Sequence, residues 1–106
     1  MLFRSLYKAW LAEEGEGHVV AGSGLWLMDW PPHVIGQSAY RGNILNVYTE
    51  PAYRKRGLAR QLTQAALDWC WANEVDVVIL HASEDGRALY ENLGFKPTNE
   101  MRLLKP

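Results

Sequence analysis

Three cationic side chains stand immediately before a glycine near the middle of the chain. Arg54, Lys55 and Arg56 precede Gly57, and a helical pattern of apolar residues begins directly after the glycine. A helix N-terminus carries about half a positive charge, so cations at this position are unfavourable unless a negative group offsets them. The backbone N–H groups of a helix N-terminus bind phosphate, and a glycine lets the phosphate approach the backbone closely. The segment is therefore a candidate anion site.

A solvated run of charge and a contact with nucleic acid are the two other interpretations of this segment. The 106 residues contain 11 Lys and Arg against 12 Asp and Glu, a formal net charge of −1. A near-neutral chain without a wider basic stripe is not typical of a nucleic-acid-binding protein, and we expect no nucleic-acid partner. The phosphate loop of nucleotide hydrolases, G-x-x-x-x-G-K-[ST], is absent from the sequence.

The spacing of apolar residues predicts the elements that hold this segment. A helix is expected from Gly57 to Asn73, and the apolar residues on its buried face are Leu58, Leu62, Ala65, Ala66 and Trp69. Before it, alternating and β-branched runs predict strands at residues 6–14, 18–28 and 44–49. Gly15 and Gly17 predict a short turn between the first two strands.

A second strand and helix follow the first helix. The apolar run at residues 75–82 is typical of a strand that is covered on both faces. Ser83 is a suitable N-cap for a helix at residues 84–92, Gly94 is suited to the position after it, and residues 95–104 predict a broken last strand. The predicted order is β-β-β-α-β-α-β. It indicates an α/β or α+β domain with a mixed sheet, spanning residues 1–106.

Composition limits the class of protein. Hydrophobic residues make up 48% of the chain, which is enough for one core. Cys70 is the single cysteine, so we expect no disulfide framework and no cysteine-based metal site, and we expect Cys70 to be a buried small hydrophobe. No apolar run approaches the roughly 20 residues of a membrane span, and the first ten residues lack the long apolar region and small-residue cleavage site that are typical of a secretory signal. We expect a cytoplasmic protein without a membrane partner.

Two blocks of the sequence resemble the GNAT N-acetyltransferases. Arg54-x-x-Gly57-x-Ala59 matches the family signature [QR]-x-x-G-x-[GA], and "ALYENLGF" at residues 88–95 is similar to the helix and strand that follow it. The resemblance covers roughly residues 7–104. It implies a GNAT-like acyl-CoA N-acyltransferase fold that lacks the usual N-terminal strand and two helices, either as a truncated product or as a minimal variant.

The resemblance implies a coenzyme A site on the strand at residues 44–49 and on the loop after it. In this family, backbone groups of the strand pair with the pantetheine arm and amides of the signature loop hold the pyrophosphate. Ser83 stands where the family often has an asparagine that helps to hold the coenzyme. The implied cofactor-binding residues are Val47, Tyr48, Thr49, Arg54, Lys55, Arg56, Gly57, Leu58, Ala59, Arg60 and Ser83.

The resemblance also implies the reaction, in which a primary amine attacks the thioester of acetyl-CoA directly and without a metal. Tyr90 matches the tyrosine that lies near the coenzyme sulfur in many members, where a hydrogen bond or a proton from its hydroxyl stabilises the leaving thiolate. The acceptor is a small-molecule or peptide amine. The alternatives are a catalytically silent acyl-CoA-binding module and a structural dimerisation module with the same fold. Turnover and coenzyme affinity distinguish the three.

Several further residues are candidates for the acceptor side of the site. His33, His81 and Glu50 are candidate bases, and Trp26, Trp30 and Tyr40 flank the loop by which an acceptor would enter. Without the usual N-terminal elements, the strand near residues 6–11 is expected to be an exposed edge, which invites pairing with another chain. We therefore expect a homodimer that covers this edge.

Overall fold

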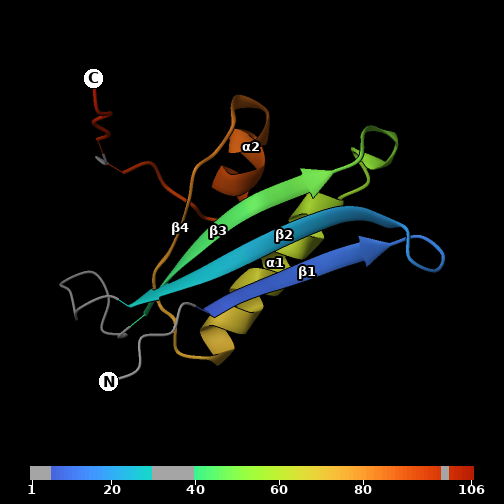
Figure 1. Ribbon diagram of the computed structural model, residues 1–106, viewed down its shortest axis with the longest axis horizontal. Helices are drawn as coiled ribbons and strands as arrows, with labels where there is room; N and C mark the ends of the chain where they lie inside the picture. The colour runs from blue at the N-terminus through green and yellow to red at the C-terminus, as the bar shows by residue number, and fades with distance from the viewer. Residues whose placement is uncertain (1–5, 30–39, 99–100) are drawn as a thin grey trace.

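The computed structural model describes residues 6–29, 40–98 and 101–106. Its four strands form one sheet in the order β1-β2-β3-β4, in which the first three strands are antiparallel and β4 is parallel to β3. Helix α1 lies along one face of the sheet, against β1, β2 and β3 (Figure 1). The elements are β1 (Leu6–Glu13), β2 (Val19–Asp29), β3 (Tyr40–Thr49), the short helix η1 (Pro51–Tyr53), α1 (Leu58–Ala72), β4 (Val78–Leu80) and α2 (Glu84–Asn92).

The turn between β1 and β2 forms as predicted. Gly15 and Gly17 have φ angles of 66° and 78°, in the left-handed region that glycine adopts without strain. The backbone N–H of Glu14 donates to the carbonyl of His18 at 2.9 Å and closes the turn. This turn therefore lies at the end of β1 and at the start of β2, beside the far end of β3, which pairs with β2 up to Thr49.

The buried face of helix α1 is slightly rotated about the helix axis from the face that the spacing of its apolar residues predicts. Leu62 and Ala66 are buried as expected, together with Thr63, Leu67 and Cys70, whereas Ala65 and Trp69 are only partly buried. The helix thereby closes the core against the sheet. The core cluster consists of Leu25, Leu27, Ile44, Ala66, Leu67, Cys70 and Val75.

The buried thiol of Cys70 makes stability depend on alkaline pH. Burial raises the pKa of Cys70 to about 11, because the thiolate would lose its hydration inside the core. Its stabilising contribution is full below the unfolded pKa of about 9 and is lost as pH rises toward 11, since the unfolded thiol ionises first. Between these two pKa values we expect the free energy of unfolding to fall by about 1–3 kcal/mol. Denaturant titrations at several pH values would measure this fall. The free energy of unfolding of Cys70→Ala should not show this decrease. The same pH dependence in both proteins would contradict the assignment to Cys70.

Near the C-terminus, one predicted strand is shorter and less buried than expected, and another is absent from the described residues. The strand predicted at residues 75–82 is reduced to three residues, and it pairs with β3 alone within the described ranges, so it is an edge strand and is only partly buried. The last strand predicted at residues 95–104 is absent from residues 95–98 and 101–104. So short a β4 offers few ladder hydrogen bonds to a fifth strand, and Pro97 has no N–H to donate. Met101 and Leu103 are accordingly 93% and 95% exposed.

Strand β1 lies at the opposite edge of the sheet, as expected. It pairs only with β2 among the described residues, and Tyr7 and Leu11 on its face away from α1 are exposed. The homodimer through this edge stays a prediction. None of the helices in the described part of the chain is long and apolar enough to cross a membrane.

Candidate functional site

Strands β3 and β4 part after three residues of pairing. Gly42 pairs with Val78, and Ile44 pairs with Leu80, and there the parallel ladder ends. Residues 45–49 of β3 continue without a β4 partner in the described chain, while on their other edge Leu45, Tyr48 and Thr49 pair with β2 and a register shift interrupts the pairing at residues 46–47. An open strand edge of this kind can accept an extended, amide-containing ligand through main-chain hydrogen bonds. Three predicted cofactor-binding residues, Val47, Tyr48 and Thr49, lie on this stretch.

The loop after β3 is held by its own side chains and backbone. Helix η1 places Arg54 so that its Nε donates to the carbonyl of Thr49 at 3.0 Å, which returns this side chain to the end of the strand. The N–H of Tyr53 donates to the carbonyl of Glu50 at 2.8 Å. The first arginine of the signature therefore holds the loop against the strand, and Lys55 and Arg56 are the exposed cations beyond it.

The start of α1 has the backbone shape of an anion cradle. Lys55 and Gly57 both have left-handed backbones, with φ angles of 64° and 77°. Gly57 is the N-cap residue and has no side chain to cap the helix, so the N–H groups of the first turn, on Leu58, Ala59 and Arg60, lack side-chain caps. A Cβ built on Gly57 would meet no atom within 4 Å, so space is open in front of these groups. The residues present here fit a phosphate group.

Arg60 makes a contact that the sequence did not reveal. Its Nη1 donates to Oδ1 of Asn92 at 3.1 Å, which ties the first turn of α1 to the last turn of α2. The two residues are 32 positions apart, so no local pattern links them. The contact couples the loop after β3 to the helix that carries Tyr90.

Helix α2 begins and ends with the caps that the sequence predicts. At its start, the Oγ of Ser83 accepts from the N–H of Gly86 at 3.2 Å, and two acidic residues in the first turn complement the helix dipole. Ser83 thus acts as a helix cap, and its contact with a coenzyme stays a prediction.

The C-terminus of α2 holds Tyr90 in place. The N–H of Gly94 donates to Glu91 and the N–H of Phe95 donates to the carbonyl of Tyr90, both at 3.0 Å, which is a Schellman ending with glycine at φ 104°. The ring of Phe95 meets that of Tyr90 edge to face at 6.0 Å between centroids. Tyr90 is 9% exposed, and burial raises its pKa, so its hydroxyl stays protonated at neutral pH.

Gly86 is a site residue that sequence reasoning missed. A Cβ on Gly86 would lie 2.9 Å from Cε2 of Tyr90 and 3.3 Å from Oγ of Ser83. Only glycine therefore lets the Tyr90 ring lie where it does. The available signal was a glycine inside a predicted helix, where it is unfavourable by about 1 kcal/mol relative to alanine.

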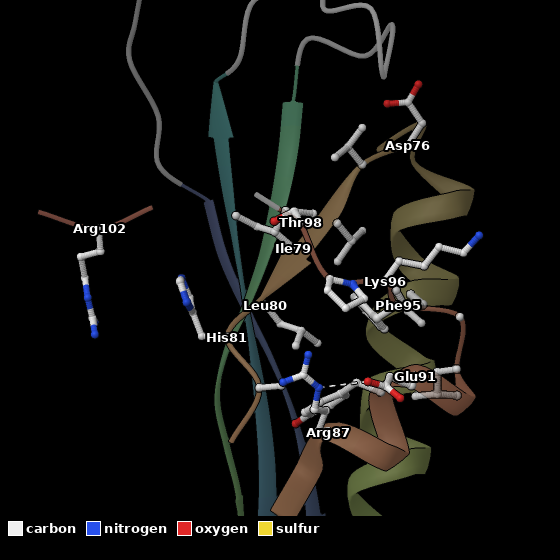
Figure 2. A pocket seen from close by; sticks show the side chains of 18 of the residues that line it. Asp76, Ile79, Leu80, His81, Arg87, Glu91, Phe95, Lys96, Thr98 and Arg102 are labelled. Atoms are coloured by element: carbon white, nitrogen blue, oxygen red, sulfur yellow. Dashed lines mark hydrogen bonds and ion pairs between the residues drawn. The ribbon is translucent and has the colours of Figure 1, made fainter. Parts of the chain in front are cut away.

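A groove of about 1250 Å³ adjoins Tyr90 on the outer side of β4 (Figure 2). It lies between β4, α2, the C-terminal segment and the side of α1 that carries Leu67 and Trp71, and its described lining includes neither β3 nor residues 54–60. His81 borders the groove and points to the opposite side of β4 from Leu80 (Figure 2). Of the other acceptor-side candidates, Trp26 on β2 is 41% exposed and Tyr40 begins β3, while His33 and Trp30 lie outside the described residues.

Comparison with known families identifies the family of this chain. The model of the Acetyltransferase (GNAT) family matches residues 2–95. The chain belongs to this family. Its mixed α/β fold and its relationship to the GNAT N-acetyltransferases agree with the predictions made from the sequence.

Individual relatives of this GNAT protein are acetyltransferases by name. The mycothiol acetyltransferase of Beutenbergia cavernae is 36% identical over 92 residues, which cover 83% of this chain and 28% of that protein. A GCN5-related N-acetyltransferase from Ralstonia eutropha superposes with a TM-score of 0.86 at 40% identity. A predicted acetyltransferase with acetyl-CoA from Clostridium acetobutylicum has the same TM-score at 30% identity. In both comparisons this chain is 94% covered and spans 64% of the solved chain.

Proposed function

We propose that this GNAT protein transfers the acetyl group of acetyl-CoA to a primary amine. The observation that carries the proposal is the open edge of β3 at residues 45–49, which leads directly into the cationic N-terminus of α1. An extended, amide-bearing arm could pair with the open edge of β3, and a phosphate group attached to it could bind at the N-terminus of α1. The similarity to an acetyltransferase with acetyl-CoA and to a mycothiol acetyltransferase supports the same ligand and reaction class.

The binding contribution of the chain comes mainly from its backbone. The first-turn N–H groups of α1, with Lys55 and Arg56 beside them, would hold the pyrophosphate, and residues 45–49 would pair with the pantetheine amides. Gly57 leaves the approach to these groups open. Arg54 serves the same site indirectly, since its contact with the carbonyl of Thr49 holds the loop at the end of the strand.

Acetyl-CoA supplies the activated acetyl group as a thioester. The acceptor amine attacks in its neutral form, so a C–N bond forms, the C–S bond breaks, and the amine gives up one proton to solvent or to a base. The Oη of Tyr90 would donate a hydrogen bond or a proton to the leaving sulfur. Its raised pKa keeps that proton in place at neutral pH, which suits a donor.

The test is turnover of acetyl-CoA with a panel of amines. The panel includes amino acids, a polyamine, an aminoglycoside and a short peptide with a free N-terminus. We expect at least one amine to increase thiol release from acetyl-CoA and to yield a product heavier by one acetyl group in mass spectrometry. Thiol release without amine is the control. Coenzyme binding with no acetylated product from any amine would contradict the transferase and would favour the acyl-CoA-binding module.

A further inference from the structure

A chain of side-chain contacts connects the turn between β1 and β2 to the cationic loop. The Nε2 of His18 lies 3.4 Å from Oε2 of Glu50, and the His18 ring meets that of Tyr53 edge on, with 6.2 Å between centroids and 88° between planes. On the other side of the contact chain, the guanidinium carbon of Arg56 lies 5.0 Å from the centroid of the Tyr53 ring. His18 and Arg56 are 38 positions apart in the sequence and are joined here through one aromatic ring.

The backbone beneath these contacts is anchored to the sheet. The N–H of Glu50 donates to the carbonyl of Val20 at 2.8 Å, and the N–H of Tyr53 donates to the carbonyl of Glu50 at the same distance. The backbone that carries Tyr53 is therefore held to the sheet by hydrogen bonds, and the imidazole of His18 contacts the Tyr53 ring. A cation that contacts such a ring loses part of its conformational freedom before a ligand arrives.

We infer that His18 is a positioning residue for the coenzyme phosphates: it supports the Tyr53 ring that holds Arg56 beside the cradle. The inference deepens the proposed function and rests on it.

A purely structural role for His18 would predict a different outcome. The side chains of His18 and Glu50 are 55% and 32% exposed, and neither residue belongs to the core cluster. Removal of the imidazole should therefore leave the thermal unfolding midpoint close to that of the parent protein. An effect on coenzyme affinity without an effect on stability would come from the position of Arg56.

The experiment is a double-mutant cycle read by calorimetric titration with acetyl-CoA. We expect His18→Ala and Arg56→Ala each to weaken binding about three- to fivefold, and the double variant to bind no more weakly than Arg56→Ala alone. Glu16→Gln, in the same turn, is the matched control and should stay within about twofold of the parent affinity. His18→Phe, which keeps a ring against Tyr53, should recover part of the loss.

Each contrary result has a distinct meaning. No binding by the parent protein would remove the proposed function, and the inference with it. Binding by the parent with an unchanged affinity in His18→Ala would overturn the inference alone. Additive losses in the double variant, or a His18→Phe protein as weak as His18→Ala, would overturn the route through Tyr53 and Arg56.

Discussion

Replacement of Gly57 by glutamate is expected to weaken acetyl-CoA binding at least about 100-fold in calorimetric titration. The new carboxylate would stand in the open space before the first turn of α1, where no protein atom lies within 4 Å of a built Cβ. The carboxylate would compete with phosphate for the first-turn N–H groups of α1, and its charge would repel the pyrophosphate. It would also force a left-handed backbone, at φ 77°, on a residue with a side chain.

Two further variants separate charge from backbone strain. Gly57→Ala carries the strain without the charge and should lose only a few fold in affinity. Gly57→Gln adds a side chain of the same length without the charge and should lose less affinity than Gly57→Glu. Unchanged affinity in Gly57→Glu would show that phosphate is not held at this helix terminus. Equal losses in Gly57→Ala and Gly57→Glu would attribute the effect to strain alone.

Tyr90→Phe is expected to lower kcat by about 100-fold, while the affinity for acetyl-CoA changes by no more than about twofold. The variant removes only the hydroxyl, so the ring contact with Phe95 and the helix ending at Gly94 remain. Steady-state rates with the best amine of the panel, combined with titration of the coenzyme, provide the measurement. A kcat within a few fold of the parent value would mean that Tyr90 is a packing residue.

Gly86→Ala serves as the matched perturbation of position, because it keeps the Tyr90 hydroxyl and moves the ring. The added methyl group would come within 2.9 Å of Cε2 of Tyr90, so the ring must shift. We expect kcat to fall about tenfold with an unfolding midpoint equal to or above that of the parent, since alanine favours a helix over glycine by about 1 kcal/mol. A marked fall in the unfolding midpoint together with the fall in kcat would point to general damage to α2.

The parts of the fold that could be predicted are those specified by neighbours in sequence. Helix α1 begins after Gly57, as predicted, because glycine adopts the left-handed backbone of that position without strain. Helix α2 begins after Ser83, as predicted, because the Ser83 hydroxyl accepts from an N–H three residues further on. Gly94 ends α2 by the same local geometry. The signature at residues 54–59 likewise predicts an anion cradle, since backbone N–H groups next to a glycine need no distant partner to form one.

The rest was decided by contacts across the sheet. The apolar run at residues 75–82 has strand propensity throughout, yet only three of its residues pair with β3. Local propensity does not determine where two strands separate, because that depends on contacts with distant segments. The contact of Arg60 with Asn92, the closeness of Gly86 to the Tyr90 ring and the link from His18 to Arg56 are all side-chain geometry. Sequence alone determined the family, the helix ends and the backbone of the candidate anion cradle, since these depend on local order along the chain. Tertiary structure alone determined the open edge of β3 and the positions of the side chains around the site, since these depend on which distant segments pack together.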